Sequence, residues 1–191
     1  MSIEWVGQKL NEKFKTIRLS IDNILLDPNN YRIISSETEY QKVPEERIGE
    51  LEVQEDTQAL MEQRGELDPL IKSILRIGFL PIDRVVVRLW KDGKYVVVEG
   101  NRRIAAIKKI LKDYERGRIS LREDVLNSIK EIEVLVIDEE KRNIPVLQNL
   151  IQGIRHVQGV KGWGPYERAM MIKELYESCL LYTSPSPRDR G

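Results

Sequence analysis

Two consecutive arginines, Arg102 and Arg103, follow a run of three valines, a glutamate, a glycine and an asparagine. This order predicts a buried strand that passes through Gly100 directly into a helix. Basic residues in the first turn of a helix are unfavourable by roughly 0.3–1 kcal/mol each compared with acidic ones. Backbone N–H groups, a glycine that permits close approach and two guanidinium groups favour a phosphate or carboxylate ligand. Gly100, Asn101, Arg102 and Arg103 therefore form the candidate anion site, with a surface turn carrying two solvated arginines as the structural alternative.

Three further groups of residues could take part in chemistry. Glu99 is the candidate catalytic residue, as a Mg²⁺ ligand or a general base, although it could equally neutralise Arg102 or Arg103 when no ligand is bound. Arg155 and His156 could contact phosphate or donate a proton, whereas their alternative role is to complement the negative end of a helix. The nearby aromatic residues, Trp163 and Tyr166, could stack on a base or simply pack against the last helix.

The elements that position these residues alternate between strands and helices. The clearest local prediction is a hairpin, because Asp92-Gly93 lies between two apolar runs. Spacings of three and four residues between apolar side chains predict the helices, and Gly78 ends one of them. The predicted strands are 16–19, 21–26, 85–90, 95–98 and 132–137, the last of them interior. The predicted helices are 4–14, 44–63, 69–77, one that follows Arg103 and buries Ile104, Ile107, Leu111 and Tyr114, 124–130, 139–154 and 165–178.

The segment from about 35 to 66 is polar and rich in acidic residues. We interpret it as an insertion on the surface, in which the helix over 44–63 carries Ile48, Leu51 and Leu60. A solvated face is the ordinary interpretation of such a charge run, and partner docking is the alternative.

Composition excludes several classes of protein. The 191 residues contain 31 basic and 31 acidic side chains, so no global field draws the chain onto DNA or an anionic membrane. One cysteine and one histidine cannot build the usual zinc sites, which leaves Mg²⁺ brought in with a phosphate ligand. The absence of a long apolar run and of a signal-peptide pattern predicts a cytoplasmic protein without membrane contact.

The last thirteen residues, 179–191, read as the translation of a sequencing adapter. We expect them to be disordered, with a native Ser/Pro-rich tail as the alternative. On this interpretation Cys179 is not native and the natural protein continues past Ser178.

Several motifs occur in a fixed order: Asp27-Pro28-Asn29-x-x-Arg32, then Leu70-x-x-Ser73-Ile74-x-x-x-Gly78-x-x-Pro81, then the hairpin, then Val98-Glu99-Gly100-Asn101-Arg102-Arg103-x-Ala105-Ala106. This set resembles the amino-terminal domain of ParB proteins, in the ParB/sulfiredoxin superfamily, over roughly 17–137. The resemblance implies an α+β fold, a small mixed sheet flanked by helices, in residues 1–138. Residues 139–178 would then be a C-terminal helical extension that is truncated here.

The resemblance also implies a function. In this family the equivalent turn holds the triphosphate of a nucleotide together with Mg²⁺, which makes Gly100, Asn101, Arg102 and Arg103 the nucleotide-binding residues. Arg32 would lie beside them, and Asn149, Arg155 and His156 would supply a second motif. The sulfiredoxin cysteine is absent because Asn101 stands within this turn, so sulfinic-acid reduction is not expected.

The resulting hypothesis is a switch domain of a DNA-associated protein that binds a CTP- or ATP-type triphosphate with Mg²⁺. DNA contact is expected mainly through the region beyond Ser178, and a homodimer is left open. One alternative is a ParB-like nuclease or a nucleotide-dependent phosphotransferase, in which Glu99 and Asp27 are the one carboxylate pair we can suggest. The other is a non-catalytic protein-interaction domain that uses the acidic segment.

Overall fold

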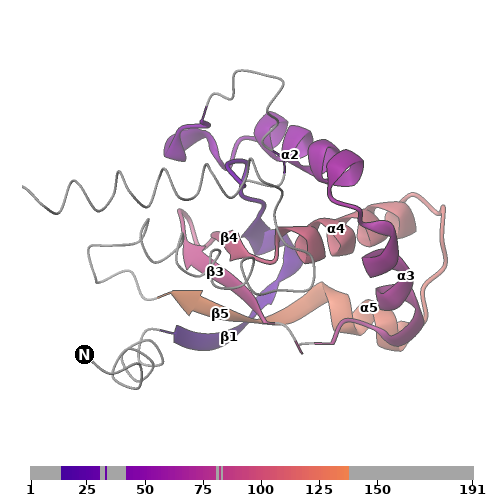
Figure 1. The fold of residues 1–191 in the computed structure, drawn as a ribbon. Coiled ribbons are helices and arrows are strands. Elements are labelled where there is room, and N and C mark those ends of the chain that lie inside the picture. Colours follow the sequence, from indigo (N-terminus) through magenta and orange to yellow (C-terminus); the bar gives the residue numbers. More distant parts are fainter. Residues whose placement is uncertain (1–13, 31–32, 34–41, 81, 83, 138–191) are drawn as a thin grey trace, which may run out of the picture.

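A mixed five-stranded sheet with helices packed on it makes up the described part of the chain (Figure 1). The computed structural model describes residues 14–30, 33, 42–80, 82 and 84–137. The α+β class expected from the sequence is confirmed. The strands are β1 (Phe14–Ser20), β2 (Ile24–Leu25), β3 (Val85–Leu89), β4 (Tyr95–Glu99) and β5 (Glu131–Ile137), and the α-helices are α2 (Leu51–Arg64), α3 (Asp68–Ile77), α4 (Asn101–Glu115) and α5 (Glu123–Lys130), with short 3-10 helices η1 (Ile21–Asn23) and η2 (Glu45–Arg47).

The strand order in the sheet is β1-β5-β3-β4-β2. Antiparallel pairing joins β1 to β5 and β3 to β4, whereas β5 pairs with β3 and β2 with β4 in parallel. The interior position expected for β5 is confirmed, since it lies between β1 and β3. The strand expected over 21–26 is mostly wrong: Ser20 caps a 3-10 turn over Ile21–Asn23, so only two residues remain for β2.

The hairpin between β3 and β4 is confirmed. The backbone N–H of Trp90 donates to the carbonyl of Lys94 at 2.8 Å, and the N–H of Lys94 donates to the carbonyl of Lys91 at 2.8 Å. Asp92 and Gly93 both adopt positive φ angles, 52° and 73°. Asp-Gly is favoured at such positions because both residues tolerate the left-handed region.

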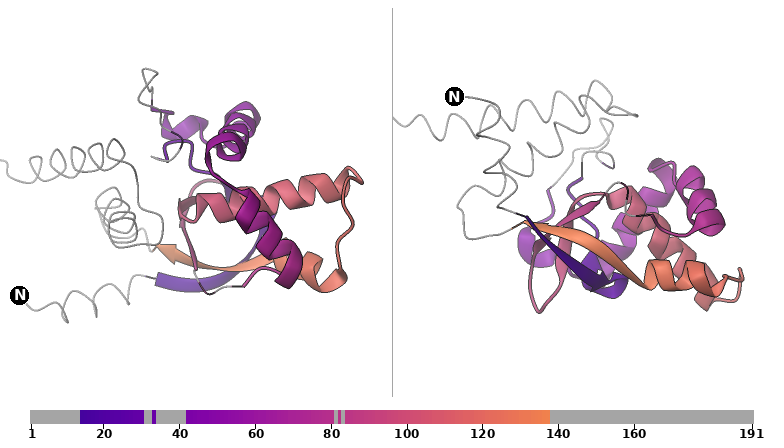
Figure 2. Two further views of the ribbon diagram at one scale, coloured as in Figure 1. Left: turned by 45° about the vertical axis from the view of Figure 1, so that its right-hand side comes forward. Right: turned by 90° about the horizontal axis from the view of Figure 1, so that it is seen from below.

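Alternating side chains of the strands are buried on opposite faces of the sheet. The main core joins Val85, Val87, Val97 and Val134 to Ile74 of α3 and Ile129 of α5, and α4 adds Ile104, Ala105, Ala106, Ile107 and Ile110. On the other face Val86, Val98 and Ile137 form a separate buried cluster. Figure 2 shows α3, α4 and α5 on the same side of the sheet. The valine-rich strands are therefore buried on both faces, as continuous apolar runs predict.

Helices α3 and α4 follow their predicted ranges closely. Gly78 ends α3 with a φ of 78°, which confirms the stop predicted there. Ile104 and Ile107 of α4 are buried and Leu111 is partly buried, as expected. Tyr114 is an exception, because its side chain is 38% exposed near the end of the helix, beyond the region that packs on the sheet.

The acidic segment is less peripheral than the sequence suggested. Its helix begins at Leu51, later than expected, because the chain first forms the 3-10 turn η2 and passes Gly49. A Cβ at Gly49 would lie 2.3 Å from the Trp90 ring, so this turn is packed closely against the hairpin. Met61 of α2 is fully buried in the main core, whereas Leu51 is 75% exposed. The surface expectation therefore holds only for the outer side of α2.

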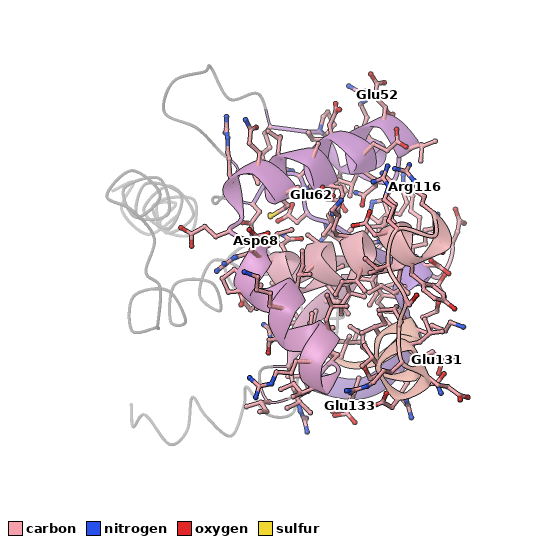
Figure 3. The ribbon with its side chains drawn as sticks, turned by 90° about the vertical axis from the view of Figure 1, so that its right-hand side faces the viewer. Glu52, Glu62, Asp68, Arg116, Glu131 and Glu133 are labelled. Carbon is pink, nitrogen blue, oxygen red and sulfur yellow. The ribbon has the colours of Figure 1, made fainter. Side chains whose placement is uncertain are left out.

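Helix α2 lies along α4, as the side-chain view shows (Figure 3). Lys109 Nζ of α4 is 3.6 Å from a carboxylate oxygen of Glu62, which is labelled near the end of α2 in that view. Gln58 Nε2 donates to the carbonyl of Ala105 in α4 at 3.0 Å. Together with the burial of Met61, these contacts dock the acidic helix on the element that carries the candidate site.

No helix in the described residues is long and apolar enough to cross a membrane. The predicted helices over 4–14, 139–154 and 165–178 lie outside the described residues, except for Phe14, which begins β1. The adapter-like segment lies outside them as well.

Candidate functional site

The strand-to-helix turn predicted from the sequence is present at the junction of β4 and α4. Gly100 is the residue that precedes the helix and has a φ of 105° and a ψ of 18°, a conformation that side chains rarely permit. Its carbonyl accepts the N–H groups of Arg103 and Ile104 at 2.9 and 3.1 Å. The first turn of α4 contains no acidic residue, and the glycine supplies no capping side chain. The positive end of the helix dipole is therefore offset neither by a carboxylate in that turn nor by a side-chain cap from residue 100.

Arg103 folds back over the glycine toward the sheet. Its Nη2 atom lies 3.5 Å from Glu99 Oε1, and both side chains are mostly buried, at 15% and 13% exposed. A Cβ added at Gly100 would lie 3.1 Å from the same Nη2 atom and 3.1 Å from a methyl group of Val85. Glycine is thus favoured at position 100 by the backbone conformation and by the close approach of this guanidinium group.

Arg102 points to a different part of the molecule. Its Nε donates to the carbonyl of Gly65, and its Nη2 donates to the carbonyl of Glu66 at 2.8 Å. Both acceptors belong to the short connection between α2 and α3. The adjacent arginines therefore have different partners: Arg103 pairs with Glu99, and Arg102 binds neutral backbone oxygens.

Asn101 turns its side chain inward. The residue is 4% exposed, its Oδ1 accepts the backbone N–H of Asp27 at 3.0 Å, and its Nδ2 donates to the carbonyl of Asp27 at 3.5 Å. The side chain thus binds both backbone groups of one residue, as a neighbouring strand would. It holds the turn after β2 beside the first residue of α4.

Two more amide side chains extend this arrangement. Gln54 of α2 accepts the N–H of Leu26 at 2.8 Å and donates to its carbonyl at 2.9 Å. Asn29 likewise accepts from and donates to the backbone of Val43, at 2.9 and 3.0 Å. Sequence analysis did not identify Gln54. The sequence shows only an amide side chain on a predicted helix, and this does not identify the backbone of Leu26 as its hydrogen-bond partner.

Asp27 is the titratable group most strongly affected by this environment. Burial raises its pKa to about 6, against the lowering effects of the Asn29 N–H bond and of the positive charges of Arg88 and Lys42. The Oδ1 atom accepts that N–H at 2.9 Å, which closes a local turn. The carboxyl therefore changes its charge near neutral pH at a position tied to the start of α4.

The described residues contain no group of three or more His, Cys, Asp or Glu side chains that could hold a metal ion. Glu99 is the nearest carboxylate to the turn in sequence, and its Oε1 faces Arg103. Mg²⁺ prefers oxygen ligands and often keeps phosphate oxygens in its coordination shell.

The structure brings Glu99, Gly100, Asn101 and Arg103 together with the Asp27 turn. Arg102 lies on the same turn but is directed to the connection between α2 and α3. The other predicted binding residues, Arg32, Asn149, Arg155 and His156, lie outside the described residues.

Comparison of the chain with protein-family models and with curated proteins finds no match. The family resemblance therefore depends on the ordered motifs in the sequence.

Proposed function

We propose that the chain is a ParB-like switch domain that binds the phosphates of a CTP- or ATP-type nucleotide at the start of α4. The observation that carries the proposal is the β4–Gly100–α4 turn, in which a left-handed glycine leads into a helix whose first turn holds two arginines and no acidic residue. Such a helix start attracts anions through its backbone N–H groups and its dipole. Hydrogen bonds from charged groups contribute about 1.5–3 kcal/mol each, so even one guanidinium would add appreciably to affinity.

Arg103 is the side chain we expect to contact the ligand first. In the structure its charge is shared with Glu99 across 3.5 Å, a separation longer than that of a strong ion pair. A phosphate that approaches the turn would compete with Glu99 for the same guanidinium. Mg²⁺ bound with the nucleotide would reduce repulsion between the phosphate and the displaced carboxylate.

The ordered motifs support the ParB/sulfiredoxin-like assignment within the α+β class. On this proposal the protein also contacts DNA, and a homodimer is left open. Arg32 and the second motif, Asn149, Arg155 and His156, would complete the nucleotide site.

A thermal-shift titration with CTP, ATP, GTP and ADP, each with Mg²⁺, tests the proposal. Ligand at 100 times its dissociation constant adds about 2.7 kcal/mol to stability and raises the melting temperature. Arg103→Ala should remove most of this shift. Arg118→Ala is the matched control, because Arg118 also pairs with a carboxylate, that of Asp113 at 3.2 Å, but at the opposite end of α4 from the turn. No shift with any nucleotide, or equal shifts in both variants, would contradict the proposal.

The enzyme alternative gains one specific observation. Burial raises the pKa of the Asp27 carboxyl to about 6, and Asn101 holds the backbone of this residue at the start of α4. A group with a pKa near the working pH is suited to general acid–base catalysis. Release of nucleoside diphosphate, or nicking of plasmid DNA in the presence of Mg²⁺, would favour this alternative over simple binding. A protein partner captured without any nucleotide affinity would instead favour an interaction domain.

A further inference from the structure

The connection between α2 and α3 is short and strained. Helix α2 ends at Arg64, and the N–H of Gly65 donates to the carbonyl of Met61 at 2.8 Å, which completes the last turn. Glu66 follows with a φ of 48°, in the left-handed region that residues other than glycine rarely adopt. Helix α3 then begins at Asp68, which is labelled in Figure 3 close to the start of α4. The connection thus needs outside contacts to keep its conformation.

Arg102 supplies two of those contacts from the first turn of α4. It donates from Nε to Gly65 and from Nη2 to Glu66, so one guanidinium edge binds two successive carbonyls. The carbonyls belong to residues 37 and 36 positions away in the sequence. This makes Arg102 a direct link between the candidate site and the end of the acidic helix.

The same edge of a guanidinium group is the one that binds phosphate in a bidentate manner. The two acceptors described for this edge, on Gly65 and Glu66, are neutral carbonyl oxygens, whereas a phosphate oxygen is charged and forms a stronger hydrogen bond. A phosphate at the start of α4 therefore competes for Arg102 with the carbonyls of Gly65 and Glu66.

We infer that Arg102 is a switch residue that exchanges the α2–α3 connection for the ligand phosphate, so that ligand binding loosens the end of the acidic helix. This inference rests on the proposed function, because it takes the ligand to be a phosphate at the start of α4. When Arg102 leaves, Glu66 loses a contact that holds its left-handed conformation and the last turn of α2 opens more often. The contacts of Gln58 and Glu62 with α4 keep the rest of α2 docked. The ligand would thereby change the conformation of one end of the acidic helix without releasing it.

Hydrogen exchange of the Gly65 amide, measured by NMR or on short peptides, reports how often the last turn of α2 opens. We expect saturating Mg–CTP to speed this exchange about tenfold in the full chain, the effect of losing roughly one net hydrogen bond. Arg102→Gln should show the faster exchange without ligand and no further change when Mg–CTP is added. Arg122→Gln is the matched control, since Arg122 also donates to a backbone carbonyl, that of Arg76 at the end of α3, far from the turn. It should behave as the wild type.

Arg102→Lys provides a second variant in case the glutamine substitution impairs folding. Lysine keeps the positive charge but lacks the rigid fork that reaches both carbonyls, so it should bind Mg–CTP and exchange quickly at Gly65 even without it. A thermal shift with Mg–CTP but an unchanged Gly65 amide in the wild type would overturn the switch and leave the proposed function intact. No thermal shift with Mg–CTP, Mg–ATP or Mg–tripolyphosphate would overturn both. Equal Gly65 exchange in Arg102→Gln and in the wild type would overturn the link itself, whatever the ligand.

Discussion

Replacing the aspartate at position 27 by asparagine should make the protein more stable at neutral pH. Burial raises the pKa of the Asp27 carboxyl from 3.8 to about 6, so the folded protein favours the neutral form of this group. Each unit of pKa difference corresponds to about 1.36 kcal/mol, which gives about 3 kcal/mol in total. The stabilisation of the folded state by the neutral carboxyl is fully present below pH 3.8 and is lost as the pH rises through about 6. The ionised carboxylate therefore destabilises the folded state at neutral pH.

The substitution is well suited to isolate this effect. The Asp27 side chain accepts the N–H of Asn29, and the amide oxygen of asparagine can accept the same bond. Asn101 binds only the backbone of residue 27, so its contacts are retained. The introduced amide would remain neutral at every pH, and the variant would therefore lack the destabilisation that the wild type suffers as its carboxyl ionises.

Urea unfolding followed by tryptophan fluorescence at about pH 5.0 and about pH 7.5 measures the difference. From the pKa values of Asp27 in the unfolded and folded states, the free energy of unfolding of the wild type should fall by about 1.4 kcal/mol over this pH interval. The stability of Asp27→Asn relative to the wild type should therefore rise by about 1.4 kcal/mol between the two pH values. Asp56→Asn, on the exposed side of α2, shows what loss of one surface carboxylate does. An advantage of Asp27→Asn that is the same at both pH values, or that falls as the pH rises, would show that burial does not raise the pKa of this carboxyl.

Two substitutions test the turn itself by urea unfolding. Asn101→Ala should lower the free energy of unfolding by about 2–3 kcal/mol, because it removes both hydrogen bonds to Asp27 and leaves their backbone partners unsatisfied. The control, Asn127→Ala on the exposed side of α5, should lower it little. Equal losses in the two variants would show that the Asn101 amide does not hold the turn. Gly100→Ala should lower the free energy of unfolding by about 2 kcal/mol or more, a larger loss than that of Gly93→Ala. Both glycines have positive φ, but only position 100 of the two is crowded by a guanidinium group and a valine, so a smaller loss at 100 would refute the crowding.

The local elements were predictable because each has a signal within a few residues. Asp92-Gly93 identified the hairpin, Gly78 identified the end of α3, and the continuous runs of valine identified the buried strands. The errors came from competition between short-range signals. The apolar run after Ser20 looked like one strand, but a side-chain cap turned its first half into a 3-10 helix. The acidic segment looked peripheral from its composition, although burial of Met61 ties it to the core.

The candidate site divides in the same way. The amino-acid sequence by itself determined that a strand leads through Gly100 into a helix that opens with two arginines, since φ preference and hydrophobic periodicity are local properties. Only the tertiary structure decided what those side chains contact: Asn101 binds a residue 74 positions away, and Arg102 binds carbonyls 37 and 36 positions away. A polar side chain in a turn can satisfy its hydrogen bonds with any segment that packs against it. Which segment arrives there depends on how the whole core is packed.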